Sequence, residues 1–214
     1  QYPPDLRIIR VMCSGRIDPV FIFRAFKLKA DGVIVLGCHP GDCHYQSGNY
    51  YAARKAKFIT KVLKICGIES ERFMLDWVSA AEGARFAEVI ADFTQRVRNL
   101  PPIGETEGLE GKAKLALKVA ETERLRWLTG KEAELTTQGN VYNELIDQKQ
   151  FDDIMDKNIE ESFLMHQISS LVADNPLKPC EVAQSLKIPP NKAFRLLLKM
   201  EDNGLAAQYD MKDR

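Results

Sequence analysis

The stretch that decides the fold is residues 33–45, VIVLGCHPGDCHY. Its first four residues form a wholly apolar run of the kind that is buried in a parallel sheet. The run ends at Gly37 and passes into a loop rich in glycine, histidine and cysteine. A long helical pattern follows over residues 47–66, with Gly67 in position to end it. The stretch therefore predicts a buried strand, a polar loop and a helix.

The same alternation of strand and helix extends to both sides of this stretch. Residues 7–12 (RIIRVM) and 72–78 (RFMLDWV) are strand candidates, and residues 81–100 have the spacing of an amphipathic helix. Asp18-Pro19 is typical of a helix start. We therefore expect an α/β fold with a small, mostly parallel sheet of three to four strands, flavodoxin-like or Rossmann-like. Because three strands make a thin sheet, we also expect a further strand ahead of Gln1.

Prolines at 101 and 102 close this first domain, which we place at residues 1–102. Residues 103–160 are expected to form a linker and two polar helices, near 113–127 and 140–155. The apolar stripes of these helices are modest, so we expect them to lie against another surface through Trp127, Leu128 and Phe151.

The last segment, residues 161–214, predicts an all-α helix-turn-helix domain of winged-helix-like type. The expected helices cover residues 162–173, 179–186 and 191–203, and the wing after Leu205 is barely present in the sequence. A DNA-binding face on the third helix would consist of Asn191, Lys192, Arg195 and Lys199.

The electrostatics of that domain favour a protein partner over DNA. Residues 162–214 hold 7 basic and 6 acidic residues, a net charge of +1. Phosphate contacts dominate the affinity of DNA-binding proteins, so a net charge this small is a weak footprint. We therefore expect the helix-turn-helix to dock a protein, and a nucleic acid partner is not expected.

The composition narrows the class of protein further. The 214 residues carry no net charge, but residues 1–104 hold 15 basic and 10 acidic residues, and residues 105–214 hold 15 and 20. No apolar run approaches the ~18 residues of a membrane span, and the N-terminus does not resemble a signal peptide. Five cysteines in such a chain favour reduced thiols or metal ligands over disulfides. We expect a cytoplasmic protein.

Three cysteines are expected to meet at one edge of the sheet. Cys38 and Cys43 follow the strand at residue 33, and Cys13 follows the strand candidate before it. Ligands of open parallel sheets bind at the carboxyl ends of the strands, and thiolates select zinc or iron–sulfur clusters. His39 and His44 are expected to be hydrogen-bonding neighbours rather than ligands.

The other cysteine chemistry of the chain has a plainer interpretation. Cys66 and Cys180 are expected to be core residues, since a buried cysteine behaves as a small apolar side chain. A nucleophile made of Cys43 and His44 is not expected, because adjacent loop residues seldom point at each other. The chain contains no phosphate-binding loop, dinucleotide fingerprint, serine-hydrolase elbow or zinc-protease motif.

The blocks VMCSG (residues 11–15) and GCHPGDCHY (residues 37–45) resemble the delta, iron–sulfur subunit of methyl-viologen-reducing hydrogenase. The same module is found fused to the flavoprotein of heterodisulfide reductase, and the resemblance covers about residues 1–102. It implies a [2Fe–2S] cluster with Cys13, Cys38 and Cys43 as ligands. The family normally carries a Cys-x-x-Cys segment ahead of the position of Gln1. Its absence here implies a shortened chain, a lost cluster, or substitution by His39 or His44, and shortening is favoured.

The resemblance implies an electron-transfer subunit rather than a catalyst in its own right. It would relay electrons between a hydrogenase or formate-dehydrogenase-type partner and a heterodisulfide-reductase-type flavoprotein. The alternative is a metal- or redox-sensing transcription regulator that uses the C-terminal helix-turn-helix. A third interpretation is a structural adaptor whose thiols are simply buried.

Overall fold

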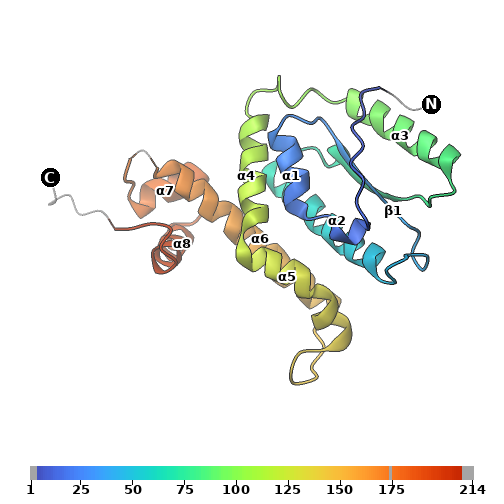
Figure 1. Ribbon diagram of the computed structural model, residues 1–214. Helices are drawn as coiled ribbons and strands as arrows, with labels where there is room; N and C mark the ends of the chain where they lie inside the picture. The colour runs from blue at the N-terminus through green and yellow to red at the C-terminus, as the bar shows by residue number, and fades with distance from the viewer. Residues whose placement is uncertain (1–3, 174, 209–214) are drawn as a thin grey trace. The chain divides into compact units, whose positions relative to one another are not determined.

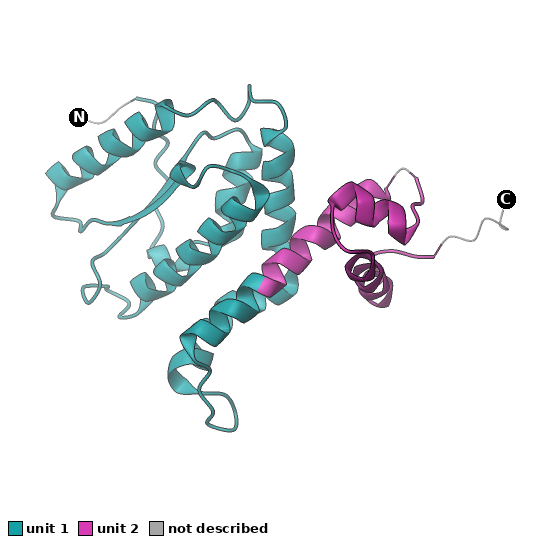
Figure 2. Cartoon of the chain, turned by 180° about the vertical axis from the view of Figure 1, so that it is seen from behind, with its two compact units in different colours: residues 1–156 teal, residues 157–214 magenta. Residues whose placement is uncertain are grey.

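The computed structural model describes residues 4–173 and 175–208. The chain divides into two compact units, Gln1–Asp156 and Lys157–Arg214 (Figure 2). In chain order the elements are η1 (Ser14–Arg16), α1 (Pro19–Lys27), β1 (Val33–Gly37), α2 (Gly48–Cys66), η2 (Ser70–Arg72), β2 (Phe73–Trp77), α3 (Gly83–Arg98), α4 (Leu109–Glu121), α5 (Glu123–Ala133), a π-helical turn η3 (Glu134–Gln138), α6 (Gln148–Leu171), α7 (Pro179–Leu186) and α8 (Pro190–Asp202).

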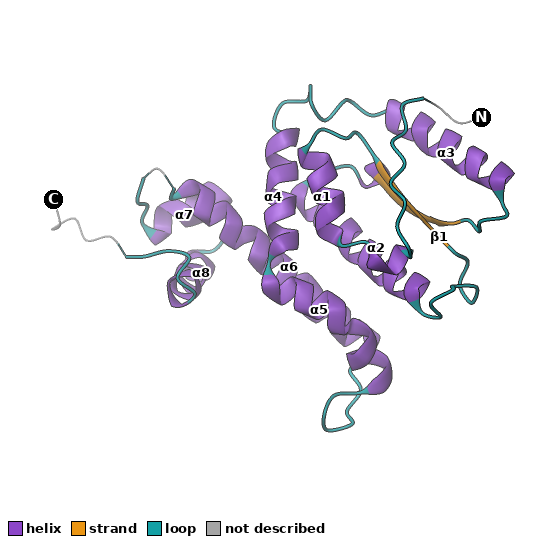
Figure 3. Ribbon diagram, viewed as in Figure 1, coloured by secondary structure: helices purple, strands orange, loops and turns teal. Residues whose placement is uncertain are grey.

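The first unit is built on a parallel pair of strands. β1 pairs with β2 from Val33 opposite Phe73 to Gly37 opposite Trp77, and α2 crosses between them. Helix α3 lies on one side of the strands, and α1 and α2 lie on the other (Figures 1 and 3). The predicted α/β class and the parallel pairing are confirmed. The sheet of the described residues has two strands, however, and not the three to four that were predicted.

The predicted strand at residues 7–12 is wrong for this structure. The segment is extended but pairs with neither β1 nor β2. Its apolar side chains face solvent, with Ile9 85% and Met12 84% exposed. A strand needs a neighbouring ladder to satisfy its backbone groups, and this segment has none in the described chain. The further strand expected ahead of Gln1 stays a prediction.

Local signals fix the ends of the helices around the sheet. The Asp18 carboxylate accepts a hydrogen bond of 3.0 Å from the Val20 N–H and caps α1. Helix α2 ends at Gly67, whose φ of 65° is the left-handed conformation that glycine adopts readily. Both ends agree with the sequence prediction.

A fully buried arginine ties the end of this α/β segment to the sheet. Arg72 donates to the carboxylate of Glu69 at 2.7 Å, to the carbonyl of Asp31 at 3.0 Å and to the carbonyl of Pro101 at 2.6 Å. The Asp31 carboxylate accepts a further bond from the Ile103 N–H at 2.7 Å. These bonds satisfy the buried charge and fix the chain where it leaves the first hundred residues.

The helices after residue 103 differ from their prediction. The helix expected near residues 113–127 is two helices, α4 and α5, because the backbone of Thr122 leaves the helical conformation between them. The helix expected near 140–155 starts only at Gln148 as α6, and residues 139–147 form a loop. Leu128 and Phe151 are buried as predicted, but Trp127 is 55% exposed and is not an anchor.

The second unit contains the end of α6 together with α7 and α8. The helix predicted at residues 162–173 is part of one continuous helix, α6, that begins at Gln148. The helices predicted at 179–186 and 191–203 are confirmed as α7 and α8. No strand follows α8 within the described residues, and residues 209–214, where much of a wing would fall, lie outside them. The core consists of Leu164, Ile168, Val182, Ala183, Ala193, Leu196 and Met200.

Candidate functional site

Two of the three predicted cysteines meet in the structure. Cys13 immediately precedes η1, and Cys43 lies in the loop between β1 and α2. Their Sγ atoms are 3.8 Å apart, with Cys43 buried and Cys13 partly buried. We call these two residues the cysteine pair.

Two glycines make room for the cysteine pair. A Cβ atom on Gly48, the first residue of α2, would lie 2.2 Å from Cys13 Sγ and 3.2 Å from Cys43 Sγ. A Cβ atom on Gly15 would lie 2.6 Å from the carbonyl oxygen of Gly48. Only residues without a side chain fit at these two positions, so the sulfur atoms occupy the space beside the start of α2.

Backbone N–H groups surround the sulfur of Cys43. Burial works to raise the pKa of this thiol, but the N–H groups of Tyr45, Asn49 and Gly48 donate to the sulfur, and the pKa falls below its ordinary value. The start of a helix favours negative charge for the same reason. Cys43 is therefore the member of the pair that ionises more readily.

Cys13 has the opposite tendency. Burial raises the pKa of its thiol, and the neighbouring Cys43 adds to that effect, while the backbone N–H of Gly15 opposes it. The Lys55 ammonium lies nearby and donates to the carbonyl of Gly15 at 2.6 Å, and burial lowers the pKa of that lysine. The pair thus combines one thiol that holds its proton with one that releases it.

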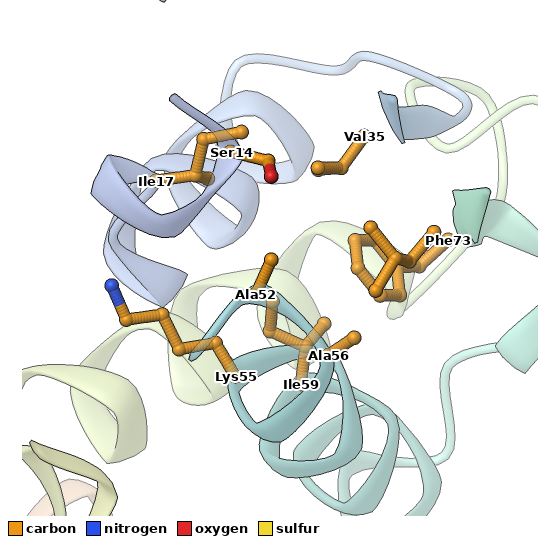
Figure 4. Close-up of a pocket in the computed structure, with 9 residues that line it drawn as sticks. Ser14, Ile17, Val35, Ala52, Lys55, Ala56, Ile59 and Phe73 are labelled. Atoms are coloured by element: carbon orange, nitrogen blue, oxygen red, sulfur yellow. The ribbon is translucent and has the colours of Figure 1, made fainter. Parts of the chain in front are cut away.

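A small pocket adjoins this region, between η1, the strands and α2 (Figure 4). Its polar side chains are Ser14 and Lys55. Because the rest of the lining is hydrocarbon, the ligating atoms of this region are those of the cysteine pair. The apolar members are Ile17, Val35, Ala52, Ala56, Ile59, Phe73 and Leu75.

The third predicted site residue, Cys38, is exposed and does not join the pair. Its loop is held by Asn49, a buried side chain that donates to the carbonyls of Cys38 at 3.4 Å and His39 at 2.7 Å. Among the described residues, no three His, Cys, Asp or Glu side chains are grouped around a common position for a metal ion. The structure therefore supplies two grouped thiols and a third on the same loop.

The two loop histidines have partners of their own. His39 Nε2 lies 2.7 Å from the carboxylate of Glu82, which also accepts from the Ser79 N–H at 2.7 Å. The Ser79 bond, followed by the His39 bond, lowers the pKa of Glu82 to about 2. His44 lies edge-on to Tyr45, with ring centroids 5.0 Å apart. The prediction that His39 is a hydrogen-bonding neighbour agrees with this geometry.

The remaining cysteines divide. Cys66 is buried in the last turn of α2, as expected of a core residue, and burial raises the pKa of its thiol to about 12. Cys180 is exposed, so its predicted core position is wrong. It sits at the second residue of α7, where Val182 and Ala183 supply the buried face.

Three residues that shape the site were not identified from the sequence: Gly48, Asn49 and Lys55. A glycine followed by asparagine at the start of a helix is the only sequence signal that they offer. That pair is compatible with an ordinary helix start, and only the structure shows the sulfur atoms against it.

Fold and site define an α/β protein whose distinguishing chemistry is a pair of cysteines at the start of a helix. A family model described as methyl-viologen-reducing hydrogenase, delta subunit, matches residues 1–101. The iron–sulfur (D) subunit of the vhc F420-non-reducing hydrogenase of Methanococcus voltae is 52% identical over 102 residues, 48% of this chain and 71% of that protein. The chain belongs to this family of hydrogenase delta subunits.

Two further relatives show how widely the module is used. The iron–sulfur (D) subunit of the F420-non-reducing hydrogenase of Archaeoglobus profundus is 52% identical over 101 residues, 47% of this chain and 74% of that protein. The large (A) chain of the Ferredoxin:CoB-CoM heterodisulfide reductase of Methanosarcina mazei is 42% identical over 103 residues, 48% of this chain and 13% of that protein. The similarity to hydrogenase and heterodisulfide reductase components that the sequence indicated is confirmed.

The membrane prediction has a limited structural counterpart. Across residues 4–173 and 175–208, no helix combines the length and the apolar character that crossing a bilayer requires.

Proposed function

We propose that residues 1–102 bind an iron–sulfur cluster of the [2Fe–2S] type and serve as an electron-transfer module. The proposed ligands are Cys13, Cys43 and Cys38. The observation that carries the proposal is the Sγ–Sγ distance of 3.8 Å in the cysteine pair. The names of the relatives as iron–sulfur proteins support the same cofactor.

The distance in the cysteine pair fits two thiolates on one tetrahedral metal. With metal–sulfur bonds of about 2.3 Å and tetrahedral angles, two thiolate ligands lie about 3.8 Å apart. The described residues thus provide two ligands at a suitable spacing. Cys38 would become the third through a change in the loop that carries it, and a [2Fe–2S] centre usually takes four ligands.

The surroundings of the cysteine pair suit bound thiolates. The N–H groups that donate to Cys43 would stabilise negative charge on its sulfur, and such bonds raise the reduction potential of a centre. Gly15 and Gly48 keep side chains out of the space beside the sulfur atoms. Bound there, the cluster would supply one-electron transfer.

The proposed partners follow from the relatives. We propose that the module accepts electrons from a hydrogenase partner and passes them to a flavoprotein of the heterodisulfide reductase A type, in the cytoplasm. The excess of basic residues in the first half of the chain would favour acidic partner surfaces. A formate-dehydrogenase-type partner, which the names of these relatives do not mention, stays a prediction.

The division of labour along the chain is also a proposal. Residues 1–102 would be the electron-transfer module, residues 103–160 a helical extension and residues 161–214 a separate helix-turn-helix domain. The family match ends at residue 101, so the later residues would serve a purpose of this chain's own.

Iron and acid-labile sulfide, measured in full-length protein prepared without oxygen, test the proposal. We expect about two iron and two sulfide per chain, and visible absorption that Cys43→Ser abolishes. Cys180→Ser is the matched control, because Cys180 is exposed on α7 and should leave the iron content unchanged. Iron-free wild-type protein, or equal iron in Cys43→Ser, would contradict the proposal.

A further inference from the structure

Helix α8 presents apolar side chains to solvent on the face opposite its core. Its buried stripe consists of Ala193, Leu196 and Met200. On the other side, Phe194 is 51% exposed and Leu198 is 40% exposed, one helical turn apart. A helix whose apolar residues lie on both sides has a second surface to cover.

The lysines that flank this face are already neutralised. Lys192 Nζ lies 2.5 Å from the Glu160 carboxylate, and Lys199 Nζ lies 2.6 Å from that of Glu161. Both glutamates belong to α6, so these pairs hold α8 within its own unit. Of the three cations that would contact DNA, only Arg195 makes no ion pair with a described residue.

The start of α8 is also poorly suited to DNA. Pro189 and Pro190 occupy the N-cap and the first helical position, and neither carries the backbone N–H that a helix start offers to phosphate. With two lysines paired and two donors missing, few groups remain for the phosphate contacts on which DNA affinity depends. The exposed apolar side chains favour a protein surface instead.

The charges on this face are arranged to complement themselves. Arg195 lies toward the start of α8 and Asp202 at its end, both exposed on the same side as Leu198. At 3.6 residues per turn they are two turns apart, about 10 Å, with Leu198 midway between them. If two such helices pack antiparallel around a two-fold axis near Leu198, each Arg195 lies opposite the Asp202 of the other copy.

We propose that this face is the interface of a homodimer, with a second copy of the chain as its occupant. We call it the α8 face and define it by Asn191, Phe194, Arg195, Leu198 and Asp202. Leu198 of the two copies would meet at the axis and Phe194 would extend the apolar contact. The two Arg195–Asp202 pairs would fix the antiparallel direction. The same patch serves both copies, as two-fold symmetry requires, and apolar centres with charged rims are usual in such interfaces.

Sedimentation velocity of the full-length chain over a range of concentrations tests the proposal. We expect a dimer for the wild type, and a rise of roughly tenfold or more in its dissociation constant for Arg195→Glu or Asp202→Arg. The double variant R195E/D202R should restore the dimer, because the pairs re-form with exchanged charges. Lys157→Glu, the same charge change at an exposed residue of α6, is the control and should leave the dimer intact.

Four outcomes would overturn the proposal: a monomeric wild type, a dimer unaffected by Arg195→Glu, a double variant that stays monomeric, and loss of the dimer in the control. Duplex DNA at about 150 mM salt is added as a separate arm. Binding by a monomer that Arg195→Glu abolishes would assign the α8 face to DNA and would also overturn the proposal.

Discussion

Replacing Gly48 with alanine should separate the cysteine pair without unfolding the protein. The new Cβ atom would lie 2.2 Å from Cys13 Sγ, whereas ordinary contact begins near 3.4 Å. The Cys13 sulfur or the start of α2 must therefore move by about 1.2 Å. Metal–ligand distances tolerate about 0.2 Å, so a shift this large should abolish binding between the two thiolates.

The effect of Gly48→Ala on stability should be moderate. Overpacking of this kind costs about 1–3 kcal/mol, and replacing a helical glycine by alanine returns up to about 1 kcal/mol. Gly83 is the matched control: it is also the first residue of a helix, and a Cβ there meets nothing within 4 Å. Gly83→Ala should therefore be neutral or slightly stabilising.

Titration of the full-length variants with cobalt(II) measures the effect without requiring an assembled cluster. Thiolate-to-cobalt absorption should appear in the wild type and in Gly83→Ala and be lost in Gly48→Ala. Thermal unfolding in parallel should show that Gly48→Ala still folds. Equal cobalt absorption in the two alanine variants would refute the reasoning that Gly48 is required by the sulfur atoms.

Three other predictions concern the fold around the site. Arg72→Met should lower the free energy of unfolding by about 3 kcal/mol in a urea titration, because a fully buried guanidinium loses three acceptors; a change under 1 kcal/mol would contradict this. Burial raises the pKa of Asp18, but its bonds to Arg126 outweigh burial and hold that pKa below its ordinary value. The unfolded chain thus binds the proton first, and this stability is lost as the pH falls below about 4 through the folded pKa; Asp18→Asn should flatten that acid dependence of the melting temperature, and an unchanged profile would refute it. Alkylation of native protein at pH 8, followed by mass spectrometry, should label exposed Cys180 well before buried Cys66, whose pKa of about 12 keeps it a thiol, and the reverse order would be inconsistent with the structure.

Much of the first unit could be predicted because its signals are local. The apolar run at residues 33–36 and the turn glycine at 67 each specify one element, and both strands and their helices were located this way. The meeting of Cys13 and Cys43 was expected from the rule that ligands gather at the carboxyl ends of parallel strands. That expectation agrees with the structure even though Cys13 follows an unpaired segment and not a strand.

Long-range effects explain what could not be predicted. Residues 7–12 have a strand-like composition, but pairing depends on a neighbour that the local sequence does not reveal. The exposure of Cys180 depends on the rotation of α7 against its core. Gly48 is visible in the sequence, but the sulfur atoms beside it come from a residue 35 positions earlier and from a separate loop.

Electron paramagnetic resonance of the reduced, full-length protein tests the central claim most directly. A [2Fe–2S] centre that has taken up one electron is paramagnetic, so the account predicts about one unpaired spin per bound cluster. The signal should disappear in Cys13→Ser and persist in Cys180→Ser, since only Cys13 belongs to the cysteine pair. A wild type without the signal, or a signal unchanged in Cys13→Ser, would contradict the assignment of the cysteine pair to an electron-transfer cluster.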